Sequence, residues 1–191
     1  HAEDLGVECT TCHSPDKHKM QIVTKTECMS CHHEALDIDC AHCHPATAAL
    51  YSGQTEAWEG VEGYADVMAD AEVECVECHD LDGPLSRESL QTTCIDCHDD
   101  DYGATMTEWI AEIGSELDAA KAELSALQNL VDRRRGATTV VSELQTAAAM
   151  VDLIDMGRGV HNYELSLEVL AQARERLTRV RDLVAPASAA R

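Results

Sequence analysis

The chain has 191 residues, and 14 lysines and arginines stand against 36 aspartates and glutamates, which gives a formal net charge of −22. A surface with this charge repels nucleic acids and anionic lipids, which excludes both as expected partners. No apolar stretch reaches the length that a membrane-spanning helix needs. We therefore expect no transmembrane segment.

One pentapeptide, Cys-x-x-Cys-His, occurs five times in the first 103 residues. This pattern is the attachment signature of c-type haem, in which two thiols form thioethers with the vinyl groups and the next histidine binds the iron. Cys-x-x-Cys also opens many zinc sites, but here a histidine follows every copy and the five copies use all ten cysteines. The sequence therefore predicts five haem c groups. The predicted attachment residues are Cys9, Cys12, Cys28, Cys31, Cys40, Cys43, Cys75, Cys78, Cys94 and Cys97, and the predicted proximal iron ligands are His13, His32, His44, His79 and His98.

Residues 1–103 form the predicted pentahaem-binding domain. The whole chain has no Phe, two Trp and four Tyr, so this half has few large side chains with which to build a core. We expect the porphyrins to be its hydrophobic core, and we expect it not to fold without them. Pro15, Pro45 and Pro84 interrupt any long periodic pattern, which predicts loops and short helical turns.

The motif spacing contains a repeat. Cys9 and Cys28 are 19 residues apart, as are Cys75 and Cys94, and Val-Glu precedes the first cysteine of both pairs. We interpret this as a two-haem unit used twice, with the motif of Cys40 inserted after the first copy. The alternative is a coincidence of spacing.

Residues 104–191 form the predicted helical domain. Thr105 and Glu108 have capping-box spacing and could start a helix. Further helices are predicted from about 142 to 156 and from about 161 to 184, and the three elements suggest an antiparallel hairpin or three-helix bundle that serves packing. The fold class is thus mostly α with extensive loops. The apolar seam of the first helix, at alternating steps of three and four, is Ile110, Ile113, Leu117, Ala120, Leu124, Leu127 and Val131.

Five haems offer ten axial positions, and the chain has ten histidines. The match predicts that every iron has two histidine ligands. The alternative is that some histidines lie idle at the surface and a methionine, Met20, Met29 or Met106, binds instead. The five candidate distal ligands are His1, His18, His33, His42 and His161.

The candidates differ in their surroundings. His33 follows a motif histidine directly and would point to a neighbouring haem, and His18 lies in the loop of the first two-haem unit. His42 lies inside its own motif, so it would serve another haem or be a polar filler. His1 is the weakest candidate because chain termini are often poorly anchored.

His161 is the single histidine of the helical half, and it follows two glycines that could allow close approach to a porphyrin. In the repeat, His18 aligns with Pro84 and His33 aligns with Asp99, so the second unit lacks local distal ligands. We therefore expect His161 to bind the haem of Cys75/Cys78 or that of Cys94/Cys97.

These residues resemble the multihaem c-type cytochromes. The segment Cys28–His33 is similar to haem-binding segments of cytochrome c3-like proteins. Residues 159–163, Gly-Val-His-Asn-Tyr, are similar to a segment of the cytochrome c nitrite reductase and hydroxylamine oxidoreductase group, which implies a distal ligand at His161 and helices that mediate subunit contacts. The resemblance does not extend to the catalytic haem, since the chain has no Cys-x-x-Cys-Lys motif. The family also includes extracellular cytochromes that polymerise.

The predicted function is electron transfer without enzymatic activity, because six-coordinate haems have no position open to a substrate. The alternatives are a multihaem redox enzyme of the nitrite or hydroxylamine type with one open haem, and a diffusible periplasmic electron shuttle. Expected partners are other redox proteins or an extracellular acceptor, and further copies of the chain. Head-to-tail contacts in which His1 ligates a neighbour's haem would give a filament. Thioether attachment normally takes place outside the cytoplasm, so we expect an exported protein, extracellular or periplasmic, with His1 left by a removed export signal.

Overall fold

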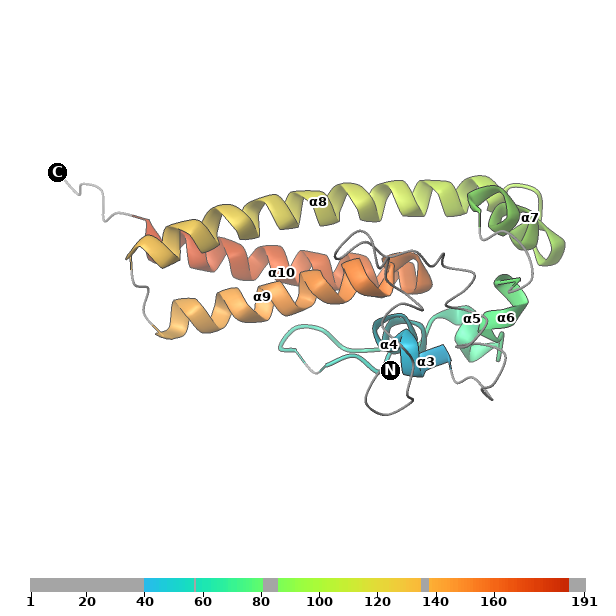
Figure 1. The fold of residues 1–191 in the computed structure, drawn as a ribbon, viewed down its shortest axis with the longest axis horizontal. Coiled ribbons are helices and arrows are strands. Elements are labelled where there is room, and N and C mark those ends of the chain that lie inside the picture. Colours follow the sequence, from blue (N-terminus) through green and yellow to red (C-terminus); the bar gives the residue numbers. More distant parts are fainter. Residues whose placement is uncertain (1–39, 57, 81–85, 135–137, 186–191) are drawn as a thin grey trace, which may run out of the picture. The chain divides into compact units, whose positions relative to one another are not determined.

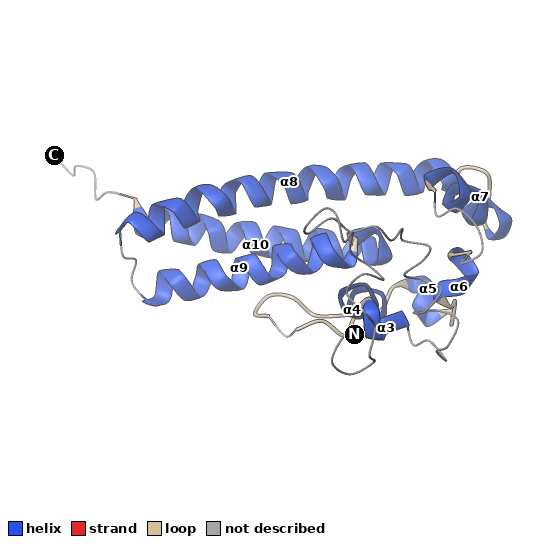
Figure 2. Cartoon of the chain, viewed as in Figure 1, coloured by secondary structure: helices blue, strands red, loops and turns tan. Residues whose placement is uncertain are grey.

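The computed structural model describes residues 40–56, 58–80, 86–134 and 138–185. Internal contacts divide the chain into two compact units, His1–Asp39 and Cys40–Arg191, so everything described lies in the second unit. Within that part, most residues are helical and none belongs to a strand, as Figure 2 shows. The mostly-α fold class is therefore confirmed. None of the described helices is long and apolar enough to cross a membrane.

Five short helices, joined by loops, lie in the described residues before 102, which agrees with the expected loops and short turns. They are α3 (Cys40–Cys43), α4 (Pro45–Ser52), α5 (Val67–Asp70), α6 (Cys75–Cys78) and α7 (Arg87–Cys97). Pro45 stands in the first turn of α4, where a missing N–H costs nothing. Ser86 and Ser89 cap the start of α7 reciprocally, at 3.0 Å in both directions.

Three long helices follow: α8 (Tyr102–Arg134), α9 (Thr138–Gly157) and α10 (Tyr163–Val184). A 3₁₀ turn, η1 (Gly159–Asn162), joins the last two. Each long helix packs against both others, and successive helices run in opposite directions (Figure 1). We call these three helices the bundle.

The predicted start of α8 is wrong by one turn. The helix begins at Tyr102, because the carbonyl oxygen of Asp99 accepts from the Tyr102 N–H and that of Asp101 accepts from the Thr105 N–H. Thr105 consequently lies inside the helix, where its hydroxyl donates to Asp101 O at 3.1 Å. A threonine so placed bonds back along the helix and does not cap it.

The bundle buries two apolar clusters. One lies near η1 and includes Ile113, Ile154 and Leu165, and the other includes Leu127 and Leu177. The seam predicted for α8 supplies both, since Ile113, Ala120, Leu127 and Val131 are buried. Complete burial of a side chain such as leucine stabilises the fold by about 1.5–3 kcal/mol.

Helix α4 is attached to the bundle through Leu50, which is fully buried in the cluster near η1. Gly157 permits this contact, since a Cβ there would lie 2.6 Å from Leu50 Cδ1 and 2.9 Å from Ala46 O. The segment carrying the Cys40 motif is thereby held at the η1 end of the bundle.

Candidate haem-binding site

The three described Cys-x-x-Cys-His motifs share one local geometry. In each, the two cysteines form a single helical turn, so both thiols lie on one side of it. The following histidine ends the turn, with φ between −108° and −121°. Its N–H donates to the carbonyl oxygen of the first cysteine at 2.9 Å in all three cases: His44 to Cys40, His79 to Cys75 and His98 to Cys94. The sequence thus places two thiols and one imidazole together by purely local means.

Helix α6 is anchored at its start by two sets of hydrogen bonds. Glu74 precedes it as N-cap, and its N–H donates to the Glu77 carboxylate at 2.7 Å, which completes a capping box. One residue earlier, Val73 O accepts from the Tyr51 hydroxyl at 2.7 Å. Tyr51 therefore fixes the entry to this motif against α4, a contact that the sequence did not reveal.

His161 in η1 lies close to His79, the motif histidine that follows α6. Their ring centres are 6.0 Å apart and their planes are inclined by 31°. A metal lies about 2 Å from an imidazole nitrogen, which is about 1.1 Å from its ring centre, so two imidazoles on opposite sides of one iron have centres about 6 Å apart. The observed distance between the two ring centres equals this value.

Hydrogen bonds set the tautomer of His161. Its Nδ1 lies 3.1 Å from Gly157 O and 2.9 Å from Arg158 O. Carbonyl oxygens only accept, so Nδ1 must carry the proton and Nε2 keeps a free lone pair for a metal. Arg158 supplies one of these oxygens from a left-handed backbone conformation, with φ of 53°, that ends α9.

Burial lowers the pKa of His79, and the nearby imidazoles of His161 and His44 lower it further. The ring is therefore neutral at pH 7, which is the form that binds metal. The three motifs also lie close together. Burial raises the pKa of the Cys75 thiol, as does the adjacent Cys40.

Burial likewise raises the pKa of the Cys78 thiol, with smaller contributions from Cys94 and Cys97. The Cys75–Cys78 motif thus has the Cys40 motif beside one thiol and the Cys94 motif beside the other.

The motif at the end of α7 has a different neighbourhood. His98 stacks on Tyr102, with ring centres 4.2 Å apart and planes 15° apart. Met106, one of the alternative ligands named above, is nearly buried, and its Sδ lies 3.9 Å from Cys94 Sγ. Gln91 holds α7 on α8 by donating to Thr107 Oγ1 at 2.7 Å.

Two glycines near His161 lie in tight contact with other parts of the protein. Gly157 admits Leu50, as described above, and a Cβ at Gly159 would lie 2.9 Å from Ile113 Cγ2 and from Ser166 Oγ. At both positions the missing side chain allows close packing against protein elements, and the expected approach of a porphyrin stays a prediction. Sequence analysis also overlooked Asn162, although an asparagine before an apolar helix is a recognisable N-cap.

Several predicted site residues lie outside the described part of the chain, and for His42 only the backbone, in α3, is described. Among the described residues, no group of three or more His, Cys, Asp or Glu side chains is arranged to hold a metal ion. A haem iron takes only two protein ligands, so this finding concerns other types of site. The residues outside are Cys9, Cys12, Cys28, Cys31, His1, His13, His18, His32 and His33, together with Met20 and Met29.

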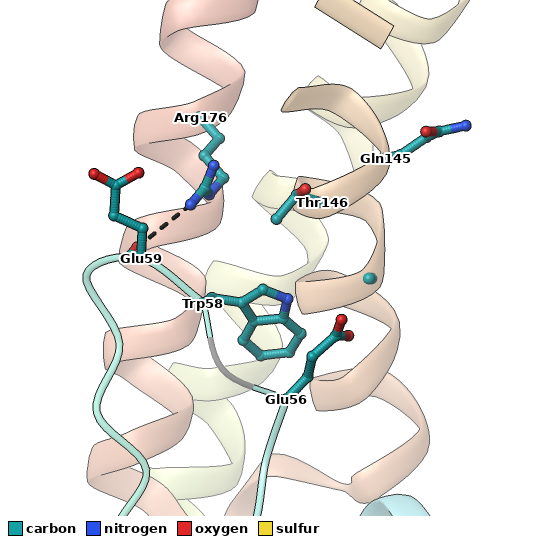
Figure 3. A pocket seen from close by; sticks show the side chains of 7 residues that line it. Glu56, Trp58, Glu59, Gln145, Thr146 and Arg176 are labelled. Atoms are coloured by element: carbon teal, nitrogen blue, oxygen red, sulfur yellow. Dashed lines mark hydrogen bonds between the residues drawn. The ribbon is translucent and has the colours of Figure 1, made fainter. Parts of the chain in front are cut away.

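A hollow of about 410 Å³ lies elsewhere, where the loop after α4 crosses α9 and α10. Trp58, Thr146 and Arg176 line it, and the Arg176 Nη2 donates to Glu59 O at 3.4 Å (Figure 3). No cysteine or histidine lines this hollow, so it is separate from the described motif residues and from His161.

Comparison with known protein families, with characterised proteins and with solved structures gives no match for this chain. The assignment of a function therefore depends on the arrangement of the residues themselves. In the described part of the chain, that arrangement consists of three motif turns and one pair of imidazoles whose ring centres are 6.0 Å apart.

Proposed function

We propose that the chain is an electron-transfer protein that carries five covalently bound c haems, at least one of which has two histidine ligands. The repetition of the attachment motif supports the number of haems. The common turn at Cys40, Cys75 and Cys94 supports a common cofactor, since each turn presents two thiols and one imidazole in the same way.

The observation that carries the proposal is the pair His79 and His161. Two imidazoles whose ring centres are 6.0 Å apart leave room between them for one iron, and the Nδ1 of His161 is already bonded to backbone carbonyls. Bound haem would supply a one-electron redox centre, and two histidine ligands leave no axial position for a substrate. Such a site exchanges electrons and does not turn over small molecules.

The neighbourhood of the three motifs supports transfer from haem to haem. The Cys75 thiol is beside Cys40, and the Cys78 thiol is affected by Cys94 and Cys97. The haem on α6 would then be the middle one of three. The net charge of −22 favours a basic redox partner over an acidic one.

The test is to produce the chain in a host that attaches haem outside the cytoplasm and to count the haems. We expect five per chain, low-spin electron paramagnetic resonance signals, and one signal that becomes high-spin in a His161→Ala variant. Fewer than five haems in the fully loaded chain, or an unchanged spectrum in that variant, would contradict the proposal. Turnover of nitrite or hydroxylamine at enzymatic rates would favour the redox-enzyme alternative.

Assembly is a separate part of the proposal. Ten histidines fill ten axial positions only if every one of them, including His1, binds iron, and a histidine of one chain could ligate a haem of another. We therefore include head-to-tail association into filaments, which follows from a heterologous contact that does not close. Electron microscopy showing particles of one small size, with an unchanged haem spectrum after deletion of His1, would reject it in favour of a diffusible shuttle.

A further inference from the structure

We propose that Asn162 is the positioning residue that aims His161 at the iron, an inference that rests on the proposed function. Its side chain is 2% exposed, and its amide atoms all have partners. Nδ2 donates to Leu50 O at 3.1 Å and to Tyr64 O at 2.8 Å, while Oδ1 accepts from the Leu165 N–H at 3.2 Å. Because Asn162 directly follows His161, these bonds fix the backbone that carries the imidazole.

The three partners belong to three different elements. Leu165 lies in the first turn of α10, so that bond caps the helix. Leu50 lies in α4, directly after the motif of Cys40, and Tyr64 lies in the loop that leads to α5 and α6. The side-chain amide of Asn162 thus connects α10 of the bundle to α4 and to the loop that precedes α5.

The connection continues to His79. Tyr51 follows Leu50, and its backbone carbonyl accepts from the Asp66 N–H at 2.9 Å. Its hydroxyl donates to Val73 O at 2.7 Å, at the residue before the N-cap of α6. The distance between the His161 and His79 rings is therefore set by bonds that pass through Asn162 and α4.

The chemistry of these positions selects asparagine. Two backbone oxygens require two N–H donors, and one backbone N–H requires an acceptor on the same short, planar group. Aspartate has the same shape but would set a carboxylate against two carbonyl oxygens. Serine can cap α10 but is too short to reach both Leu50 O and Tyr64 O. The Asn162→Ser variant therefore removes the hydrogen bonds to Leu50 O and Tyr64 O while it keeps a cap for α10.

Carbon monoxide reports the position of His161, because it binds a reduced haem only where an axial ligand is missing or easily displaced. The haem-loaded protein is titrated with carbon monoxide as the unsubstituted chain and as His161→Ala, Asn162→Ser and Asn162→Leu variants. Leu177→Ala is the control, since it weakens the bundle in the core cluster that does not contact η1. Haem content is measured for every variant.

We expect His161→Ala to bind one more carbon monoxide per chain than the unsubstituted protein. Both Asn162 variants should bind an additional fraction of one per chain, and Leu177→Ala none. Asn162 variants that match the unsubstituted protein, or a Leu177→Ala variant that matches them, would overturn the positioning role. A His161→Ala variant that keeps all haems and binds no extra carbon monoxide would instead refute the ligand pair in the proposed function, and the inference with it.

Discussion

The bundle and the motif segment, which we define as the described residues from 40 to 103, bury apolar side chains to very different extents. In the motif segment, Leu50 is the single buried large hydrophobic residue among those described, while Val67 and Val76 are 78% and 50% exposed. The bundle buries two clusters along its length. The bundle therefore has a hydrophobic core made of its own side chains. The described motif segment buries too few apolar side chains to form such a core and needs another hydrophobic group. In the proposed cytochrome, that group is porphyrin.

The largest difference between the two regions is expected when the chain is produced without haem. We expect backbone amides of the bundle to keep the protection of a folded domain, with opening free energies of about 5 kcal/mol or more, and those of the motif segment beyond α4 to approach zero. Hydrogen exchange read by mass spectrometry measures both in one sample. Equal protection of the two regions would remove the contrast.

One substitution in each region tests the same difference in the contribution of side-chain burial to stability. Leu170 is 1% exposed in the cluster near η1, so Leu170→Ala should lower the free energy of unfolding by about 2–5 kcal/mol. Val67→Ala, at an exposed position of the motif segment, should change it by less than about 0.5 kcal/mol. Urea unfolding of the haem-free chain gives both values, and similar losses would show that the motif segment has a protein core after all.

Charged groups inside the bundle provide a further contrast. The Arg176 side chain is 7% exposed and is paired with Glu143 at 3.1 Å, and the Arg176 Nε has no hydrogen-bond partner. Glu143→Gln should cost roughly 3 kcal/mol, because it leaves a buried guanidinium without its counter-charge. Asp155→Asn breaks the exposed pair with Lys121 and should cost less than about 1 kcal/mol. Thermal unfolding at two salt concentrations distinguishes them, and equal losses would contradict the role of burial.

The smallest effect concerns the boundary between the regions. Gly157→Ala places a Cβ 2.6 Å from Leu50 Cδ1 and should destabilise the chain by about 1–3 kcal/mol. Gly114→Ala is the matched control, because nothing lies within 4 Å of its added Cβ inside α8. That variant should be more stable by about 0.5–1 kcal/mol, and opposite signs for the two are the expected result of calorimetry.

Sequence reasoning succeeded where the cause was local. The apolar seam of α8 follows from spacing alone, since it depends on residues three or four positions apart, and the short helical elements before residue 102 agree with the expected short turns. It failed at Thr105, where a side-chain pattern suggested a cap but the preceding aspartate carbonyls had already started the helix. The sequence also left two candidate haems for His161, that of Cys75/Cys78 and that of Cys94/Cys97. The position of His79 depends on bonds such as Tyr51 to Val73, which join distant residues and leave no periodic trace.

His79 and His161 differ in the sequence distance of the contacts that position them, and therefore in how early during synthesis each can take its place. His79 is held by a bond to a carbonyl four residues before it, whereas His161 follows about eighty residues later, after α8 and α9. Local contacts form ahead of contacts that close a long loop. In the proposed cytochrome, the middle haem would therefore be attached first with one axial position open to water and oxidants. That iron would become six-coordinate only after η1 had packed against the motif segment. A chain truncated before η1 would therefore keep a haem whose open axial position reacts with small molecules.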